Sequence, residues 1–146
     1  MTFTESIKTC FSKYVTFAGR ASRSEFWYFM LFCLLGRTIL SLFDGFVPGM
    51  SSIQPTSWVF SLVTFLSSIC VKTRRLHDGN RWGWWQLIWL APIPVFIAAY
   101  GLKMSDLMVV VGIAMIACVV MLLFWLIAKG SEGDNRFGSN PLAADA

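Results

Sequence analysis

Residues 74–85 read RRLHDGNRWGWW, a run of charged residues, turn formers and tryptophans between two apolar stretches. The chain has 146 residues, of which 56% are hydrophobic and 14% are charged. Soluble globular domains have roughly 25% charged residues, so this composition indicates an integral membrane protein. The polar run is therefore predicted to be a turn that joins two membrane-spanning helices.

Four apolar stretches approach or reach the length that crosses the hydrocarbon core of a bilayer, about 20 residues with a range of ~17 to 25. They cover residues 26–43, 57–71, 84–102 and 107–128. The second is the shortest, and it carries hydroxyl groups on one helix face at Ser57, Ser61, Thr64 and Ser68. Such a face favours close helix contact, with a polar pathway as the alternative. The sequence predicts an all-α membrane protein of one domain, with a four-helix bundle over residues 26–128.

Residues 1–25 are predicted to form an amphipathic interfacial helix followed by a linker. Apolar side chains recur at helical spacing in the first half, with charged residues on the other faces. Thr2 and Glu5 have the spacing of a capping box at the start of this helix, and Ser22 and Glu25 repeat it at the first span. Glu25 is therefore interpreted as a structural residue.

Basic residues are concentrated in three segments: before the first span, between the second and third spans, and in the tail, residues 129–146. These residues are Lys8, Lys13, Arg20, Arg23, Lys72, Arg74, Arg75, Arg81, Lys129 and Arg136. The positive-inside rule then predicts that both termini and the 74–85 turn are cytoplasmic. Tryptophans near the predicted inner interface, such as Trp82 and Trp84, agree with this threading.

The third span contains Pro92 and Pro94 near its middle. Proline removes a backbone hydrogen bond, so a bend in this helix is predicted. A broken helix that lines a substrate cavity is the alternative, and it requires neighbouring polar side chains, of which this span has few.

Three motifs in a fixed order resemble one known family. They are TFAGRASRSEFW at residues 16–27, RRLHDGNRWGWW, and GSEGDNRFGSNP at residues 130–141. Together they are similar to the domain of unknown function 805 family, small bacterial inner-membrane proteins of the YhaH-like kind. Trp82 departs from the pattern, because a small residue is expected before the glycine. The resemblance implies a compact helical domain in the bacterial inner membrane, and it implies no activity.

All three motifs are predicted to lie on the cytoplasmic side, where they can converge on one polar face. The candidate residues for binding a ligand, a lipid or a partner are Arg20, Arg23, Arg74, Arg75, His77, Asp78, Arg81, Asn135 and Arg136. Two roles are open for the arginines. They either pair with nearby carboxylates and hold the three segments together, which we favour, or bind the phosphates of anionic lipid headgroups.

The motifs do not predict catalysis or a cofactor. His77 and Asp78 are adjacent in sequence, and adjacent side chains usually point in different directions. No nucleophile is placed beside them by spacing, and a single histidine with scattered carboxylates and four scattered cysteines has no metal-ligand pattern. The net charge of +4 is ascribed to loops that face anionic lipid, so nucleic acid is not an expected partner.

Arg37 is the charged residue that the sequence places deepest in a span. Counted from Phe26, it lies about 16 Å along the first predicted helix, where a charge is costly and usually paired. Asp44, seven residues on, is the expected partner, and Asp106 is the other candidate. A structural arginine and a residue for transport or ligand binding both remain open.

The leading hypothesis is a non-enzymatic scaffold or accessory protein whose basic cytoplasmic face binds anionic lipid or a protein partner. A small transporter or channel that uses Arg37, in homo-oligomeric form, is the first alternative. Protection against a membrane-inserting toxin is the second. An enzyme that acts on lipid headgroups is the least favoured.

Overall fold

The computed structural model describes residues 1–49 and 53–143 of the chain. Within these ranges the named elements are α1 (Phe3–Ser12), α2 (Arg23–Phe46), α3 (Pro55–Asp78), the 3₁₀ helix η1 (Gly83–Leu90), α4 (Ile93–Gly101) and α5 (Ser105–Ile127). Four segments are long and apolar enough to cross a membrane, namely α2, α3, Gly83–Gly101 and α5. The prediction of an all-helical chain with four such spans is confirmed.

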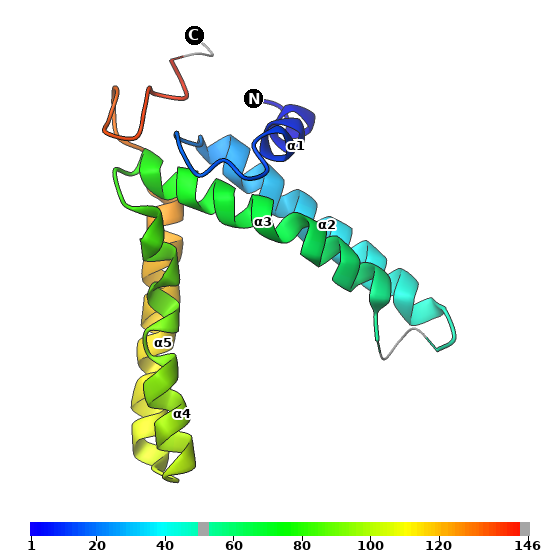
Figure 1. The fold of residues 1–146 in the computed structure, drawn as a ribbon, viewed down its shortest axis with the longest axis vertical. Helices are drawn as coiled ribbons and strands as arrows, with labels where there is room; N and C mark the ends of the chain where they lie inside the picture. The colour runs from blue at the N-terminus through cyan, green and yellow to red at the C-terminus, as the bar shows by residue number, and fades with distance from the viewer. Residues whose placement is uncertain (50–52, 144–146) are drawn as a thin grey trace.

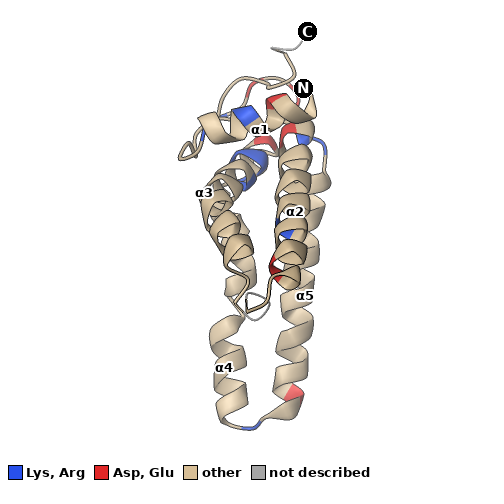
Figure 2. Ribbon diagram, turned by 90° about the vertical axis from the view of Figure 1, so that its right-hand side faces the viewer, with Lys and Arg blue, Asp and Glu red and all other residues tan. Residues whose placement is uncertain are grey.

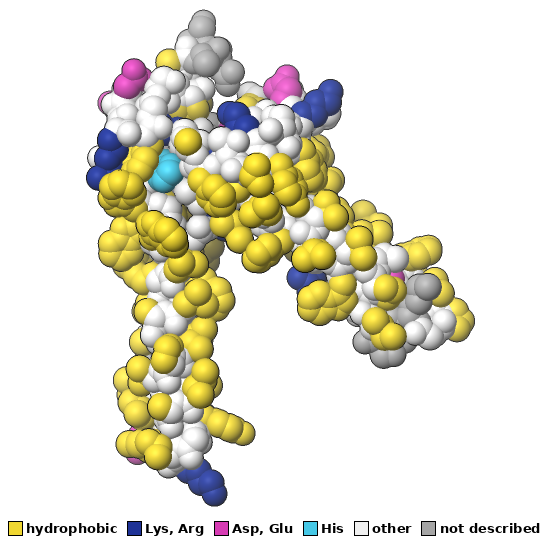
Figure 3. Space-filling view, viewed as in Figure 1, with side chains coloured by type: hydrophobic (Ala, Val, Ile, Leu, Met, Phe, Trp, Pro, Cys, Tyr) yellow, Lys and Arg dark blue, Asp and Glu magenta, His cyan; other side chains and the backbone are white. Residues whose placement is uncertain are grey.

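The four spans form two hairpins and not the predicted bundle. Helices α2 and α3 make one arm, and α5 with η1 and α4 makes the other; the arms meet at one end and diverge (Figure 1). Apolar side chains cover much of both arms on the face that Figure 3 shows. Lipid tails are as apolar as these side chains, so no hydrophobic force drives the arms together along their length.

The end at which the arms meet is polar, and we call it the polar cap. It comprises residues 17–27, 73–85 and 126–138, and α1 and the described part of the tail lie beside it (Figure 1). Most of the charged residues gather at this end, as Figure 2 shows. The cap therefore joins the two arms through polar contacts, whereas each arm is held by its own helix pair.

The far end of the α2/α3 arm is closed by Asp44, which is fully buried. Its carboxylate accepts hydrogen bonds from the hydroxyls of Thr56 (2.8 Å) and Ser57 (2.9 Å) and from the Ser57 backbone N–H (3.1 Å). Helix α3 begins at Pro55, so these contacts satisfy amides in its first turn. Asp44 is thus an N-terminal cap for α3.

Helix α1 lies against the first turns of α2. The Ser6 hydroxyl donates to the Glu25 carbonyl (2.6 Å), and the rings of Phe11 and Phe29 meet edge to face at 5.8 Å. The capping box of Thr2 with Glu5 is present, as predicted. The helix is thus anchored to the first arm, and its predicted position at the membrane interface stays a prediction.

The third span is broken at its prolines. The 3₁₀ helix η1 ends at Leu90, and α4 starts directly after Pro92, with Pro94 in its first turn. A proline has no N–H to donate to the preceding turn, so a helix bends or breaks at such a residue. Where a bend was predicted, the structure has an interruption between two helical pieces.

The start of η1 packs tightly on α3 at Gly83, where an added Cβ would overlap the buried side chain of Thr73. We expect Gly83→Ala to destabilise the protein by about 1–3 kcal/mol, because one of the two elements must move. Gly112→Ala in α5 is the matched control, since a Cβ there meets nothing within 4 Å. Thermal unfolding in detergent should separate the two variants, and equal stability would contradict the tight contact.

Candidate functional site

The first five residues of RRLHDGNRWGWW, residues 74–78, lie inside α3 and not in a loop. Helix α3 continues to Asp78, and Arg74, Arg75, His77 and Asp78 are all buried. The second span was predicted too short, because the arginines were counted as loop residues. Their charges are tolerated in the helix because other segments of the cap provide carboxylates and carbonyls.

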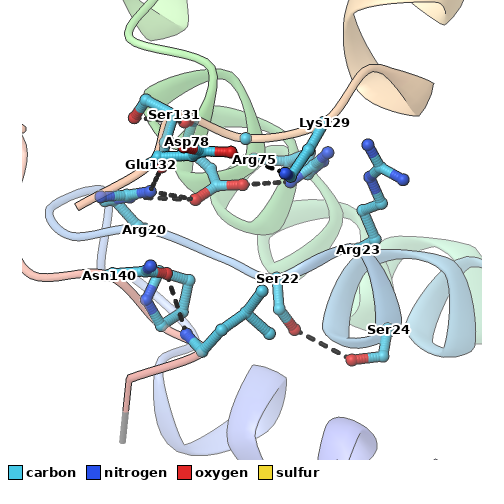
Figure 4. Close-up of a pocket in the computed structure, with 13 residues that line it drawn as sticks. Arg20, Ser22, Arg23, Ser24, Arg75, Asp78, Lys129, Ser131, Glu132 and Asn140 are labelled. Carbon is cyan, nitrogen blue, oxygen red and sulfur yellow. Dashed lines mark hydrogen bonds and ion pairs between the residues drawn. The ribbon is translucent and has the colours of Figure 1, made fainter. Parts of the chain in front are cut away.

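Asp78 is the centre of the cap. Its Oδ1 accepts a hydrogen bond from Arg20 Nε (2.9 Å), and its Oδ2 accepts one from Arg75 Nη1 (Figure 4). Its backbone carbonyl accepts hydrogen bonds from the N–H (2.8 Å) and the hydroxyl (3.0 Å) of Ser131. Nearby, Gly130 leaves no room for a side chain beside this carboxylate. One aspartate therefore links the N-terminal segment, α3 and the tail.

The two arginines bound to Asp78 use their other donors on backbone carbonyls. Arg20 donates to Ser131 (2.7 Å) and Gly133 (2.6 Å) in the tail. Arg75 Nε donates to the Leu126 carbonyl (3.0 Å) in the last turn of α5. The Leu126 carbonyl, in the last turn of α5, has no partner within the helix, and a cation beside it is favoured by the helix dipole. Arg75 thus connects the α2/α3 arm to the end of α5 in the other arm.

Glu25 forms the second buried ion pair. Its Oε1 accepts from Arg74 Nη1 at 2.5 Å, and the Cys10 thiol lies 3.8 Å from the same oxygen. Ser22 accepts from the Glu25 N–H (3.2 Å), as expected for a helix cap, but the carboxylate turns to Arg74 and does not close the predicted capping box. Arg74 Nε and Nη2 have no hydrogen-bond partner among the described residues.

Cys10 is not a reactive thiol in this setting. Burial raises the pKa of the Cys10 thiol to about 12, and the negative charge of Glu25 adds to the rise. The thiol therefore stays protonated at neutral pH and donates a hydrogen bond to the carboxylate. This contact is structural.

His77 and Asp78 do not form a pair. His77 Nδ1 lies 3.1 Å from the Gly19 carbonyl, and the imidazole stacks on the Phe137 ring with centroids 3.9 Å apart. Asn135 donates from its amide to the His77 carbonyl (2.9 Å). The stacked Phe137 ring shows that the tail folds back onto α3. The contacts of His77 hold the tail and leave no base beside Asp78.

Two further arginines of the predicted site lie on aromatic rings. The Arg136 guanidinium lies 4.8 Å from the Trp82 ring centre and 4.7 Å from that of Phe137. The Arg81 guanidinium lies 4.8 Å from the ring centre of Trp125. Trp82, the departure from the family pattern, thus packs on the folded tail. These cation–π contacts add to the internal cohesion of the cap.

A cavity of about 400 Å³ opens on the cap between the N-terminus of α2 and the tail (Figure 4). Its charged lining residues are Arg20, Arg23, Arg75, Asp78, Lys129 and Glu132. Lys129 pairs with Glu132 on the surface (2.7 Å), whereas Arg23 makes no ion pair or hydrogen bond among the described residues. Lys129 was not among the predicted binding residues, although its place two residues after the end of α5 was a usable signal.

The buried part of the cap carries more positive than negative charge. Arg20, Arg74 and Arg75 are buried together with only two carboxylates, those of Glu25 and Asp78, in the described chain. Arg20 and Arg75 share the single charge of Asp78, so the buried set has a net charge of +1. Burying an uncompensated charge is costly, so an anion at the cavity would stabilise this arrangement.

Arg37 is not paired with Asp44, which the sequence had suggested, because Asp44 caps α3. The other candidate, Asp106, contacts only Ser105 (3.4 Å) within the described chain. Arg37 instead lines a small notch on the α2/α3 arm, and Lys72 lines the same notch. Lys72 was predicted to lie in a loop, but it belongs to α3.

Comparison with known proteins agrees with the motifs. The family model described as "Protein of unknown function (DUF805)" matches residues 14–139. The inner membrane protein YhaH of Escherichia coli K12 is 31% identical over 132 residues, which cover 88% of each chain. The inner membrane protein YhaI of the same strain is 30% identical over 128 residues, 88% of this chain and 87% of the relative. No solved structure matches the chain.

Proposed function

Since this chain belongs to the DUF805 family, and the relatives above are inner-membrane proteins, we propose that it is a non-enzymatic inner-membrane protein that binds an anionic phospholipid headgroup in its polar cap. The observation that carries the proposal is the cavity beside Asp78. It combines an excess of buried positive charge with Arg23, a cation that has no acidic partner in the described chain.

The position of Arg23 supports a role in binding. Arg23 is the first residue of α2, where the positive end of the helix dipole disfavours a cation by about 0.3–1 kcal/mol. Arg20 and Arg75 add like charge around the same cavity. An arginine at this position therefore lowers the stability of the protein without a bound ligand. A bound phosphate would convert the cost into attraction, because arginine forms paired hydrogen bonds with phosphate oxygens.

The location of the cap supports a lipid as the source of the phosphate. The positive-inside rule puts the cap and both termini on the cytoplasmic side. The cytoplasmic leaflet carries a negative surface potential, and each Lys or Arg near it gains about 1 kcal/mol. The cap joins the membrane-spanning arms directly, so a headgroup can reach the cavity from the bilayer surface.

We expect the double variant Arg23→Ala/Lys129→Ala to lose lipid while it remains folded. Native mass spectrometry of protein released from nanodiscs of phosphatidylethanolamine and phosphatidylglycerol would count retained lipids. Removal of two phosphate contacts should weaken retention of phosphatidylglycerol by about tenfold or more. Thermal stability should stay the same or rise, because Arg23 opposes the α2 dipole.

The matched control is Lys8→Ala/Lys13→Ala, which removes two basic residues from the N-terminal segment outside the cavity. It should change retention by no more than about twofold, since only non-specific attraction is lost. Equal loss in both double variants would contradict a defined cavity site. Retention of a polypeptide in place of lipid would favour a protein partner for the cap.

A further inference from the structure

A second basic site lies in the membrane arm, apart from the cap. A notch of about 250 Å³ on α2 and α3 is lined by residues of three kinds: cations, hydroxyls or thiol, and aromatic rings. They are Arg37 and Lys72, then Cys33, Ser61, Thr64 and Ser68, then Phe60 and Phe65. None of these lining residues is acidic, and among the described residues neither Arg37 nor Lys72 forms an ion pair or hydrogen bond.

The hydroxyls of the notch act as hydrogen-bond donors within α3. Ser61 donates its proton to the Ser57 carbonyl and Ser68 donates to the Thr64 carbonyl, both at 2.8 Å. Thr64 donates to the Phe60 carbonyl at 2.9 Å. The protons of these hydroxyls are engaged in their own helix, so their oxygens are left as acceptors. The notch therefore offers two cations for an anion and a row of acceptors for hydroxyl donors.

The notch extends from the polar cap into the membrane arm. Lys72 precedes Thr73, which lies against Gly83 between Trp82 and Trp84, and tryptophans are enriched at the headgroup level. Arg37 lies 14 residues after the first residue of α2, about 21 Å along the helix. Its long side chain can direct the guanidinium toward that level. Unpaired cations at such depths normally mark a functional site.

The notch faces the second arm. Lys72 follows Ser68 by four residues and precedes Arg75 by three, so the three share one face of α3. Arg75 contacts the end of α5, and the same face therefore points toward the angle between the arms (Figure 1). That angle is bordered by apolar side chains, as Figure 3 shows. Acyl chains can occupy it beside a polar group held in the notch.

From these observations we propose that Arg37 and Lys72 bind the phosphate of an anionic phospholipid whose headgroup also carries hydroxyls, the chemistry of phosphatidylglycerol. The two cations hold the phosphate, and the oxygens of Ser61 and Ser68 accept from the headgroup hydroxyls. A transmembrane helix with an acidic residue is the other kind of occupant with the required charge. A carboxylate side chain has no hydroxyl donors for the oxygens of Ser61 and Ser68, so the row of acceptors favours the lipid headgroup.

The experiment compares wild type with Arg37→Met/Lys72→Met, which keeps the apolar stems and removes both charges. Lipid retention is measured by native mass spectrometry from nanodiscs of phosphatidylethanolamine with phosphatidylglycerol or with phosphatidylmethanol. Wild type should prefer phosphatidylglycerol, and the variant should lose that lipid from one site by about tenfold or more. Phosphatidylmethanol, which has the same single charge and no headgroup hydroxyl, should bind more weakly than phosphatidylglycerol. The variant Arg37→Lys/Lys72→Arg should restore binding.

Lys13→Met/Lys103→Met is the control, because it removes two charges outside the notch, and size-exclusion chromatography verifies that each variant is folded. The site is distinct from the cap cavity, so wild type should hold two lipids and each double variant should lose a different one. Loss in Arg23→Ala/Lys129→Ala with full retention in Arg37→Met/Lys72→Met would overturn this site and leave the proposed function intact. Crosslinking of position 37 to another polypeptide would also overturn it.

Discussion

Asp78→Ala is expected to lower the free energy of unfolding by about 3–5 kcal/mol, because it leaves Arg20 and Arg75 buried without their carboxylate. Both arginines are nearly inaccessible to solvent, and both bind this one side chain. Their remaining carbonyl contacts bring the tail and the end of α5 into the cap, so the loss should loosen both. Denaturation in detergent micelles, followed by tryptophan fluorescence, measures the change.

Glu132→Ala is the control for this prediction. Glu132 is also an acid paired with a cation, but the pair with Lys129 is exposed, with side-chain accessibilities of 74% and 84%. Exposed pairs add little to stability. No measurable change is therefore expected in Glu132→Ala, and an Asp78→Ala variant of equal stability would show that Asp78 does not hold the cap together.

Glu25→Ala is expected to have the second largest effect, again about 3–5 kcal/mol, because it leaves the Arg74 guanidinium buried without a charge partner. Arg74 already has two nitrogen atoms without hydrogen-bond partners among the described residues, so this cation has nothing else to bind. The same micelle denaturation would report the loss.

A second variant separates the charge from the packing in this pair. In Glu25→Met/Arg74→Met both charges are removed and much of the volume is kept. Replacing a buried ion pair by apolar residues is often neutral, so the double variant should be more stable than Glu25→Ala. A double variant as unstable as the single one would indicate that shape, and not charge, decides stability at this point.

Much of the fold follows from local patterns. The apolar stretches predicted four spans, and the prolines predicted a bend in the third, which the structure shows as an interruption at Pro92 and Pro94. Of the two predicted capping boxes, one is present. Thr2 and Glu5 form one, whereas the carboxylate of Glu25 binds Arg74, a residue 49 positions away that no local spacing identifies.

The candidate site was predicted as a set of residues but not as an arrangement. The three motifs meet in the cap, and the preference for arginines that hold the segments together agrees with the contacts of Arg20, Arg74 and Arg75. Arg20, Arg74 and Arg75 all bind carboxylates, whereas Arg23, which lines the cavity, has no partner in the described chain. In the structure the buried face of α3 continues past residue 71 through Arg74, Arg75 and Asp78, so this helix is longer than predicted.

The sequence by itself determined the class of the protein, the number of its spans and a bend in the third, because hydropathy and proline geometry are properties of consecutive residues. Tertiary structure alone decided that the spans form two divergent arms, that Asp44 caps α3, and that Arg37 shares a notch with Lys72. Lipid and protein satisfy apolar surfaces equally well, so hydropathy does not specify which helices touch. The pairing of charges depends on distances across the fold, which spacing along the chain does not encode.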